Sequence, residues 1–325
     1  MRTLSRWLAL VAVLACVALA QPAQSQVWPQ RPVKIIVPFA AGGNTDVSAR
    51  IVAQRLGQAF GQQFVVENRP GAGGARAAEA VARSPADGYT LFVTSVSVIA
   101  IVPAMTKTSY DPVKDFAPIS AIGTNPFVLV VHPSMPVNTL AEFVDYARRQ
   151  PNKLPYVLSG VGGVGHLSMA MFLKRAELDL IPVTYSVGGA ASMTDVIAGH
   201  VPIFFATLSE AVPHARSGAL RLLAVSSEMR APQIPDVPTF NEAGFPGFKA
   251  LTWNGLLAPA GTPREIIDRI AKEVASTVKD PKFIERLNSM GVDPLSNTPD
   301  EFAAMIAADI PFWAEAAKIA GVQEK

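Results

Sequence analysis

Cysteine and histidine are scarce in this chain of 325 residues, which holds one cysteine and four histidines. The cysteine, Cys16, lies in an apolar run near the N-terminus, so a chain cleaved after that run contains none. Disulfides, thiolate catalysis and cysteine-ligated metals are then excluded. The histidines are widely separated and no HExxH motif occurs, so the residues do not support a metal site. The four are His132, His166, His200 and His214.

The chain also lacks an excess of charge of either sign. It has 28 Lys and Arg against 26 Asp and Glu, which leaves a formal net charge of +2. That excess equals Arg2 and Arg6 at the N-terminus, so the rest of the chain is neutral by count. Nucleic-acid binding needs a clustered basic face, and electrostatic attachment to a membrane needs a basic cluster too. The composition therefore predicts neither.

Residues 1–26 have the features of a secretory signal peptide. Two arginines precede the uncharged apolar run Trp7–Ala20, and small residues suited to cleavage follow. The run is too short and wrongly flanked for a membrane-spanning helix, and no later run is long enough to span a bilayer. We therefore expect an exported, periplasmic protein. Lipidation at Cys16 is an alternative, because Val13–Cys16 loosely resembles a lipoprotein cleavage box.

The chain after this leader opens on a strand, a glycine turn and a helix. Val33–Val37 is an apolar, β-branched run, Gly42 and Gly43 break it, and helical spacing of apolar residues begins at Val47. Three residues of the types that cap helices lie between: Asn44, Thr45 and Asp46. Such a junction presents backbone N–H groups at the positive end of a helix, which attracts anions. The alternative is an ordinary turn that needs small residues.

Strands and helices then alternate, which predicts an α/β fold with mostly parallel sheets flanked by helices. Two short connections, Gly123–Pro126 and Thr252–Gly255, are expected to cross between two lobes. On this interpretation lobe I comprises residues 27–123 and 253–325, and lobe II comprises residues 124–252. We expect separate strands over Phe116–Ile122 and Phe127–Val131, on either side of the first crossing. Two lobes joined by two crossings are typical of a hinged binding protein.

Two further glycine junctions follow in the second lobe. Ser159–His166 contains GxGxxG after a strand and before a helix, and Tyr185–Ser192 repeats strand, glycine and helix. Taken literally, GxGxxG indicates a dinucleotide site. Export argues against that interpretation, because nicotinamide cofactors are cytoplasmic reagents. Glycines that let backbone N–H groups approach a small anion are the preferred explanation.

An exported hydrolase that uses Ser159 and His166 is the enzyme alternative. No GxSxG motif occurs, and no acid has a spacing that indicates a catalytic triad. His166 is therefore expected to pack at the helix start or to line the cleft. Asp46 and Asp195 are expected to cap helices and not to act as general bases.

Several long motifs resemble the Bug family, the periplasmic solute-binding receptors of tripartite tricarboxylate transporters. The resemblance covers nearly all of the chain after the leader. The matching stretches are Trp28–Asp46, Val65–Gly74, Asp87–Ser95, Tyr110–Ser120, Ser159–Leu167, Ile234–Gly244 and Leu256–Pro263.

The resemblance implies a two-lobed Venus-flytrap fold that holds a small carboxylate in its cleft. It implies no chemistry, no cofactor and no metal, and a monomer that delivers its ligand to inner-membrane transporter subunits. A ligand-sensing subunit of a signalling system is a further alternative. The residues expected to contact the ligand are Phe39, Ala41, Gly42, Gly43, Thr45, Asp46, Ser159, Gly160, Gly163, His166, Gly189 and Ala190.

Acids that members of this family commonly carry are missing near Ala170, Pro202 and Ala206. A pocket with fewer acids is expected to suit an organic acid better than an amino acid, whose ammonium needs an anionic partner.

Overall fold

The computed structural model describes residues 28–185, 189–289 and 291–323. The predicted signal peptide, with Cys16, and residues 186–188 of the third glycine junction lie outside the described residues. The chain divides into two compact units, Met1–Gln30 and Arg31–Lys325, and all described helices and strands belong to the second. No helix in the described part of the chain is long and apolar enough to cross a membrane.

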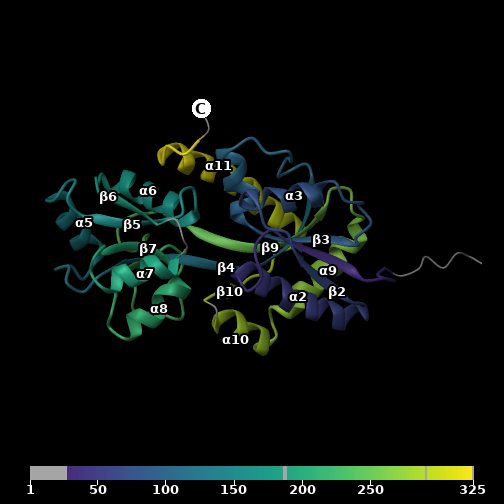
Figure 1. Cartoon of the computed structure of the whole chain (residues 1–325). Helices are drawn as coiled ribbons and strands as arrows, with labels where there is room; N and C mark the ends of the chain where they lie inside the picture. The colour runs from purple at the N-terminus through teal and green to yellow at the C-terminus, as the bar shows by residue number, and fades with distance from the viewer. Residues whose placement is uncertain (1–27, 186–188, 290, 324–325) are drawn as a thin grey trace, which may run out of the picture. The chain divides into compact units, whose positions relative to one another are not determined.

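One sheet is built around three parallel strands. β1 (Val33–Val37) pairs in parallel with β2 (Phe64–Asn68) and with β3 (Thr90–Ser95). β9 (Leu251–Pro259) continues this sheet antiparallel to β3, and β4 (Phe116–Val131) follows antiparallel to β9. The two-residue strand β10 (Asp293–Pro294) adds to β4 (Figure 1).

The C-terminal half of β4 belongs to a second sheet. There it pairs antiparallel with β7 (Ile203–Thr207) and β8 (Arg221–Val225). β5 (Pro155–Ser159) lies parallel to β7 and to β6 (Ile181–Tyr185). The predicted α/β class is therefore confirmed, with parallel βαβ units at the outer ends of both sheets. The crossing strands β4 and β9 add antiparallel pairs, because one leaves the first sheet and the other returns to it.

The first crossing is not a break between two strands, as the sequence led us to expect. β4 runs without interruption through Gly123–Pro126, and these residues pair with Asn254 to Leu251 of β9. The two crossings are thus paired to each other. Cross-strand pairing overrides the local turn signal of glycine, asparagine and proline, since each crossing supplies the other's partner.

Helices flank the sheets, and most of them begin within a few residues of the expected positions. Three helical segments were not expected from sequence: the short turn η1 (Ala72–Gly74), the π-helical turn η2 (Ser97–Ile101) and the short helix α4 (Val102–Met105). The others are α2 (Asn44–Phe60), α3 (Ala75–Ala82), α5 (Leu140–Arg148), α6 (Val164–Ala176), α7 (Gly189–Ile197), α8 (Leu208–Arg216), α9 (Arg264–Thr277), α10 (Pro281–Ser289) and α11 (Pro299–Ile319).

The glycines of the two crossings are present because of tight packing. A Cβ on Gly123 would lie 2.5 Å from Cγ1 of Val292, and a Cβ on Gly255 would overlap the ring of Phe302 on α11. Neither glycine has a positive φ. Each therefore lacks a side chain because a neighbour occupies the space, and conformational freedom is not needed to explain either glycine. The hinge itself stays a prediction.

Candidate functional site

The first glycine loop leads into α2, and the helix starts earlier than the capping residues suggested. Gly43 is the residue before the helix, with φ −74° and ψ 166°, and no described side chain caps the helix start. Asn44, Thr45 and Asp46 form the first turn instead. The first backbone N–H groups of α2 are therefore left to a ligand or solvent.

Asp46 holds the loop in place by reaching back from the first turn. Its Oδ2 accepts hydrogen bonds from the backbone N–H of Gly42 and from Nε of Arg50, both at 2.9 Å. Its Oδ1 accepts from Nδ2 of Asn68, also at 2.9 Å. Burial opposes ionisation of this 2% exposed side chain, but the hydrogen bonds outweigh burial and lower the pKa of Asp46. An ionised Asp46 therefore positions the loop, and the prediction that it caps α2 is wrong.

Thr45 and its neighbours connect the same loop to β9. Oγ1 of Thr45 donates to Oδ1 of Asn254 at 2.8 Å. Nδ2 of Asn254 donates to Oδ1 of Asn44 at 2.5 Å and, more weakly, to Oγ of Ser48 at 3.4 Å. Thr45, Ser48 and Asn254 are all buried. The start of α2 is thus fixed to a crossing strand by side-chain hydrogen bonds.

The second glycine loop repeats the geometry of the first. α6 follows Gly163, which has φ −72° and ψ 162°, and no described side chain caps this helix either. Gly160 and Gly162 have φ of 72° and 77°, values that only glycine adopts at low cost. Helix α2 packs on the first sheet and α6 on the second, and each begins after a glycine in the same extended conformation.

His166 braces this loop from inside the first turn of α6. Its Nδ1 accepts a hydrogen bond from the backbone N–H of Gly162 at 3.0 Å. The side chain is buried, and burial lowers the pKa of His166. A neutral imidazole whose Nδ1 is an acceptor suits this contact. Its role in the structure is to hold the loop, as the packing interpretation expected.

A cavity of about 250 Å³ lies next to the second loop. Of the residues predicted to bind the ligand, it includes Gly163 alone among those that the structure describes. The polar groups that reach it come from Ser97 of η2, Thr207 and Glu210 at the start of α8, and Thr252 of β9. The remaining lining residues are Phe127, Val164, Gly165, Phe204 and Phe205.

Strand β9 connects the first loop to the cavity beside the second loop. Thr252 lines the cavity, and Asn254 anchors the first loop. Because these residues are two apart on one strand, their side chains lie on the same face, about 7 Å from each other along the strand. A Cβ on Gly73 or Gly74 would meet Val102 or Val98, and one on Gly162 would meet Met105. The segment Ser97–Met105 therefore packs against η1 and against the second glycine loop.

The other predicted residues do not line this cavity. Phe39 packs at the edge of the main core, and its backbone oxygen accepts from Nδ2 of Asn68. Gly189 and Ala190 form the first turn of α7. Asp195, expected as a cap, lies near the end of α7, where the hydroxyl of Tyr185 donates to it at 2.6 Å.

Sequence reasoning missed four polar cavity residues: Ser97, Thr207, Glu210 and Thr252. Glu210 brings one carboxylate to the cavity, and Oγ1 of Thr207 donates to its Oε2 at 2.8 Å. A signal was present for two of them, since Thr207 ends strand β7 and Glu210 lies in the first turn of the helix that follows. A polar strand end followed by a helix is the same type of junction as the glycine loops, only without glycine.

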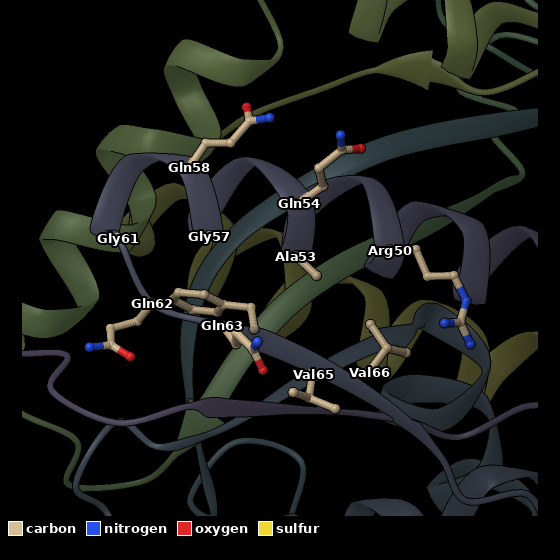
Figure 2. A pocket seen from close by; sticks show the side chains of 11 residues that line it. Arg50, Ala53, Gln54, Gly57, Gln58, Gly61, Gln62, Gln63, Val65 and Val66 are labelled. Carbon is tan, nitrogen blue, oxygen red and sulfur yellow. The ribbon is translucent and has the colours of Figure 1, made fainter.

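A larger hollow, of about 840 Å³, lies elsewhere, on the surface between α2 and β2 (Figure 2). Four glutamines and Arg50 surround it, and it contains none of the predicted ligand-binding residues. The glutamines are Gln54, Gln58, Gln62 and Gln63. It is an open depression without converging charged groups and adds nothing to the site.

Comparisons with known proteins agree with the motifs. A profile of the TctC family, described as the tripartite tricarboxylate transporter family receptor, matches residues 48–319. Protein BugT of Bordetella pertussis (strain Tohama I) is 33% identical over 327 residues, covering 99% of each chain.

Two solved structures of relatives contain dicarboxylates. Rpa4515 of R. palustris with adipate shares 36% identity at a TM-score of 0.76, covering 90% of this chain and 98% of that one. MatC (Rpa3494) from Rhodopseudomonas palustris, with bound malate, shares 31% identity at a TM-score of 0.71, covering 89% and 99%.

The family decides between a binding protein and the enzyme alternative. Its members are binding proteins, so the hydrolase alternative based on Ser159 and His166 is wrong. The chain belongs to the TctC (Bug) family of tripartite tricarboxylate transporter receptors, has their α/β periplasmic binding protein fold, and is a solute-binding receptor.

Proposed function

We propose that this receptor binds a small dicarboxylate between its two glycine loops, Phe39–Asp46 and Ser159–His166. One carboxylate is held by the start of α2 and the other end of the ligand by the start of α6 and the cavity beside it. The protein then presents the ligand to inner-membrane transporter subunits. It acts as an exported monomer whose signal peptide comprises residues 1–26.

One observation carries this proposal. Gly43 and Gly163 have almost the same backbone conformation, and each precedes a helix that no described side chain caps. Uncapped helix starts combine unpaired N–H donors with the positive end of the helix dipole, an arrangement suited to carboxylates. A ligand with two carboxylates matches two such sites better than a ligand with one. The dicarboxylates in the related Rpa4515 and MatC agree with this class of solute.

Closure would complete the site. The 250 Å³ cavity includes residues of the second loop but none from Phe39–Asp46. We therefore propose that lobe I (residues 27–123 and 253–325) and lobe II (residues 124–252) approach each other when the ligand bridges the loops. Ligand contacts that exist only in the closed state shift the equilibrium toward it.

Titration calorimetry with adipate and malate tests the proposal, and glutamate serves as a matched ligand with an ammonium group. We expect saturable binding of at least one dicarboxylate and recovery of that ligand unchanged. Small-angle scattering with saturating ligand should show a smaller radius of gyration. A folded receptor that binds no dicarboxylate, or binds one with no effect of Gly163→Val, would refute the placement of the site.

A further inference from the structure

A second cavity, of about 340 Å³, lies behind the crossing strands. Its walls come from the crossings, from residues 247–251 and from α11. The lining residues are Thr124, Gly247, Lys249, Leu251, Trp253, Leu295, Met305, Ala308, Asp309, Phe312 and Trp313. None of these residues lines the cavity beside the second glycine loop. The volume falls in the range of small-molecule sites, about 300–1,000 Å³.

The alternation of side chains along β9 separates the two cavities. Leu251 and Trp253 line the rear cavity, whereas Thr252 lines the front one and Asn254 anchors the first loop. Successive side chains of a strand point to opposite faces. The rear cavity is therefore a separate space on the other face of the same strand.

An acid lies among the aromatic residues of this rear cavity. Nε1 of Trp253 donates to Oδ2 of Asp309 at 2.6 Å. Within the described ranges, no basic side chain lies within ion-pair distance of Asp309. Lys249 lines the same cavity, but its Nζ is 2.7 Å from Oε1 of Glu228. Burial raises the pKa of Asp309 and outweighs the opposite effects of the Trp253 hydrogen bond and of the charge of Lys249.

We propose that this rear cavity binds a small organic ammonium ion with an aromatic or alkyl body. The ammonium pairs with Asp309, and the apolar body packs among Trp253, Trp313 and the neighbouring aliphatic side chains. Aromatic rings attract a cation within about 6 Å of the ring centre. Both the Asp309 carboxylate and the aromatic lining therefore favour a cation. A carboxylate ligand would instead face the charge of Asp309. The site does not depend on which solute the front cleft takes.

Titration of the full receptor with phenethylamine, without any carboxylate, tests this assignment. Calorimetry and tryptophan fluorescence should both report saturable binding, because Trp253 and Trp313 line the cavity. 2-Phenylethanol and 3-phenylpropanoate, which keep the ring and lose the positive charge, should bind at least 10-fold more weakly. Asp309→Asn keeps an acceptor for Trp253 and removes the charge, and it should weaken phenethylamine binding about 10-fold or more.

Two further variants serve as controls. Glu315→Gln removes an exposed carboxylate from the same helix and should leave amine affinity unchanged, whereas Ala308→Phe fills the cavity from an exposed position and should abolish binding. Three results would overturn the proposal: no saturable amine binding to the folded receptor, equal affinity for 3-phenylpropanoate, or equal affinities of Asp309→Asn and wild type. Gly163→Val should keep amine binding, so failure here and failure of the front site are distinguishable.

Discussion

Thr45 and Asn254 are 209 residues apart, yet Oγ1 of Thr45 donates to Oδ1 of Asn254 at 2.8 Å. This contact joins the start of α2 to the strand that returns from the second sheet. The same amide donates to Asn44 and contacts Ser48, so one side chain organises the first helical turn. The position of β9 therefore fixes the position of the first turn of α2.

Asn254→Ala should destabilise the fold and weaken dicarboxylate binding. The change leaves the buried hydroxyl of Thr45 without its acceptor and Asn44 without its donor, at about 1–3 kcal/mol for each buried group left unpaired. Urea unfolding and calorimetry measure the two effects. Asn138→Ala, at an exposed position, is the matched control and should change neither. Wild-type stability of Asn254→Ala would show that these hydrogen bonds contribute nothing.

Gly43→Val should abolish ligand binding while the protein still folds. A Cβ on Gly43 would meet only the backbone oxygen of Ala40, at 3.8 Å, and the φ of −74° suits any residue. The branched side chain then occupies the space in front of the helix start. Thermal melts and calorimetry separate folding from binding, and Gly43→Ala should show an intermediate loss of affinity. A folded valine variant with normal affinity would place the ligand elsewhere.

Asp46→Asn should be nearly as destabilising as Asp46→Ala, about 1–3 kcal/mol. Both carboxylate oxygens accept hydrogen bonds from donors, so the amide nitrogen of Asn would face a donor in either orientation. Chemical denaturation of both variants at pH 7 checks this. A mild effect of Asn alone would mean that one acceptor oxygen is enough.

The pH dependence of stability follows from the same carboxylate. The pKa of Asp46 is lowered in the folded state, so the unfolded chain binds more protons as pH falls below about 4. The stabilisation is fully present above the unfolded pKa and is lost as pH falls through the folded pKa. The free energy of unfolding should therefore fall less steeply from pH 5 to pH 2 for Asp46→Asn than for wild type.

His166 should make stability depend on pH in a higher window. Its pKa is lowered by burial, so protons bind preferentially to the unfolded chain as pH falls below about 6.5. Wild-type stability should decline from pH 7 to pH 5. His166→Asn offers an acceptor near the position of Nδ1 and does not titrate. The free energy of unfolding of this variant should therefore change less between pH 7 and pH 5. Identical pH dependence in the two proteins would show that protonation of His166 does not destabilise the folded state.

Gly255→Ala should cost about 1–3 kcal/mol, because the new methyl group overlaps the ring of Phe302. The double variant with Phe302→Leu should recover part of that loss, and thermal unfolding of the single and double variants measures the recovery. If Gly255→Ala is harmless, the glycine serves the hinge and not the packing.

The sequence by itself determined the elements whose signals are local. The apolar run Val33–Val37, the glycines before α2 and α6, and the prolines that open α10 and α11 each predict an element from a few neighbouring residues. Helical periodicity and turn chemistry act within one or two turns of chain, and for that reason they can be read without the fold. The same is true of the long motifs that indicated the family.

Only the tertiary structure decided which distant residues meet. β4 became one strand because β9 pairs with its glycine and proline, and Gly255 is small because Phe302 occupies the adjacent space. Asp46 is a brace and not a cap, since Gly42, Arg50 and Asn68 converge on it. Ser97 and Thr252 became cavity residues through the path of the chain. Such contacts depend on residues brought together by packing, and no local pattern in the chain records them.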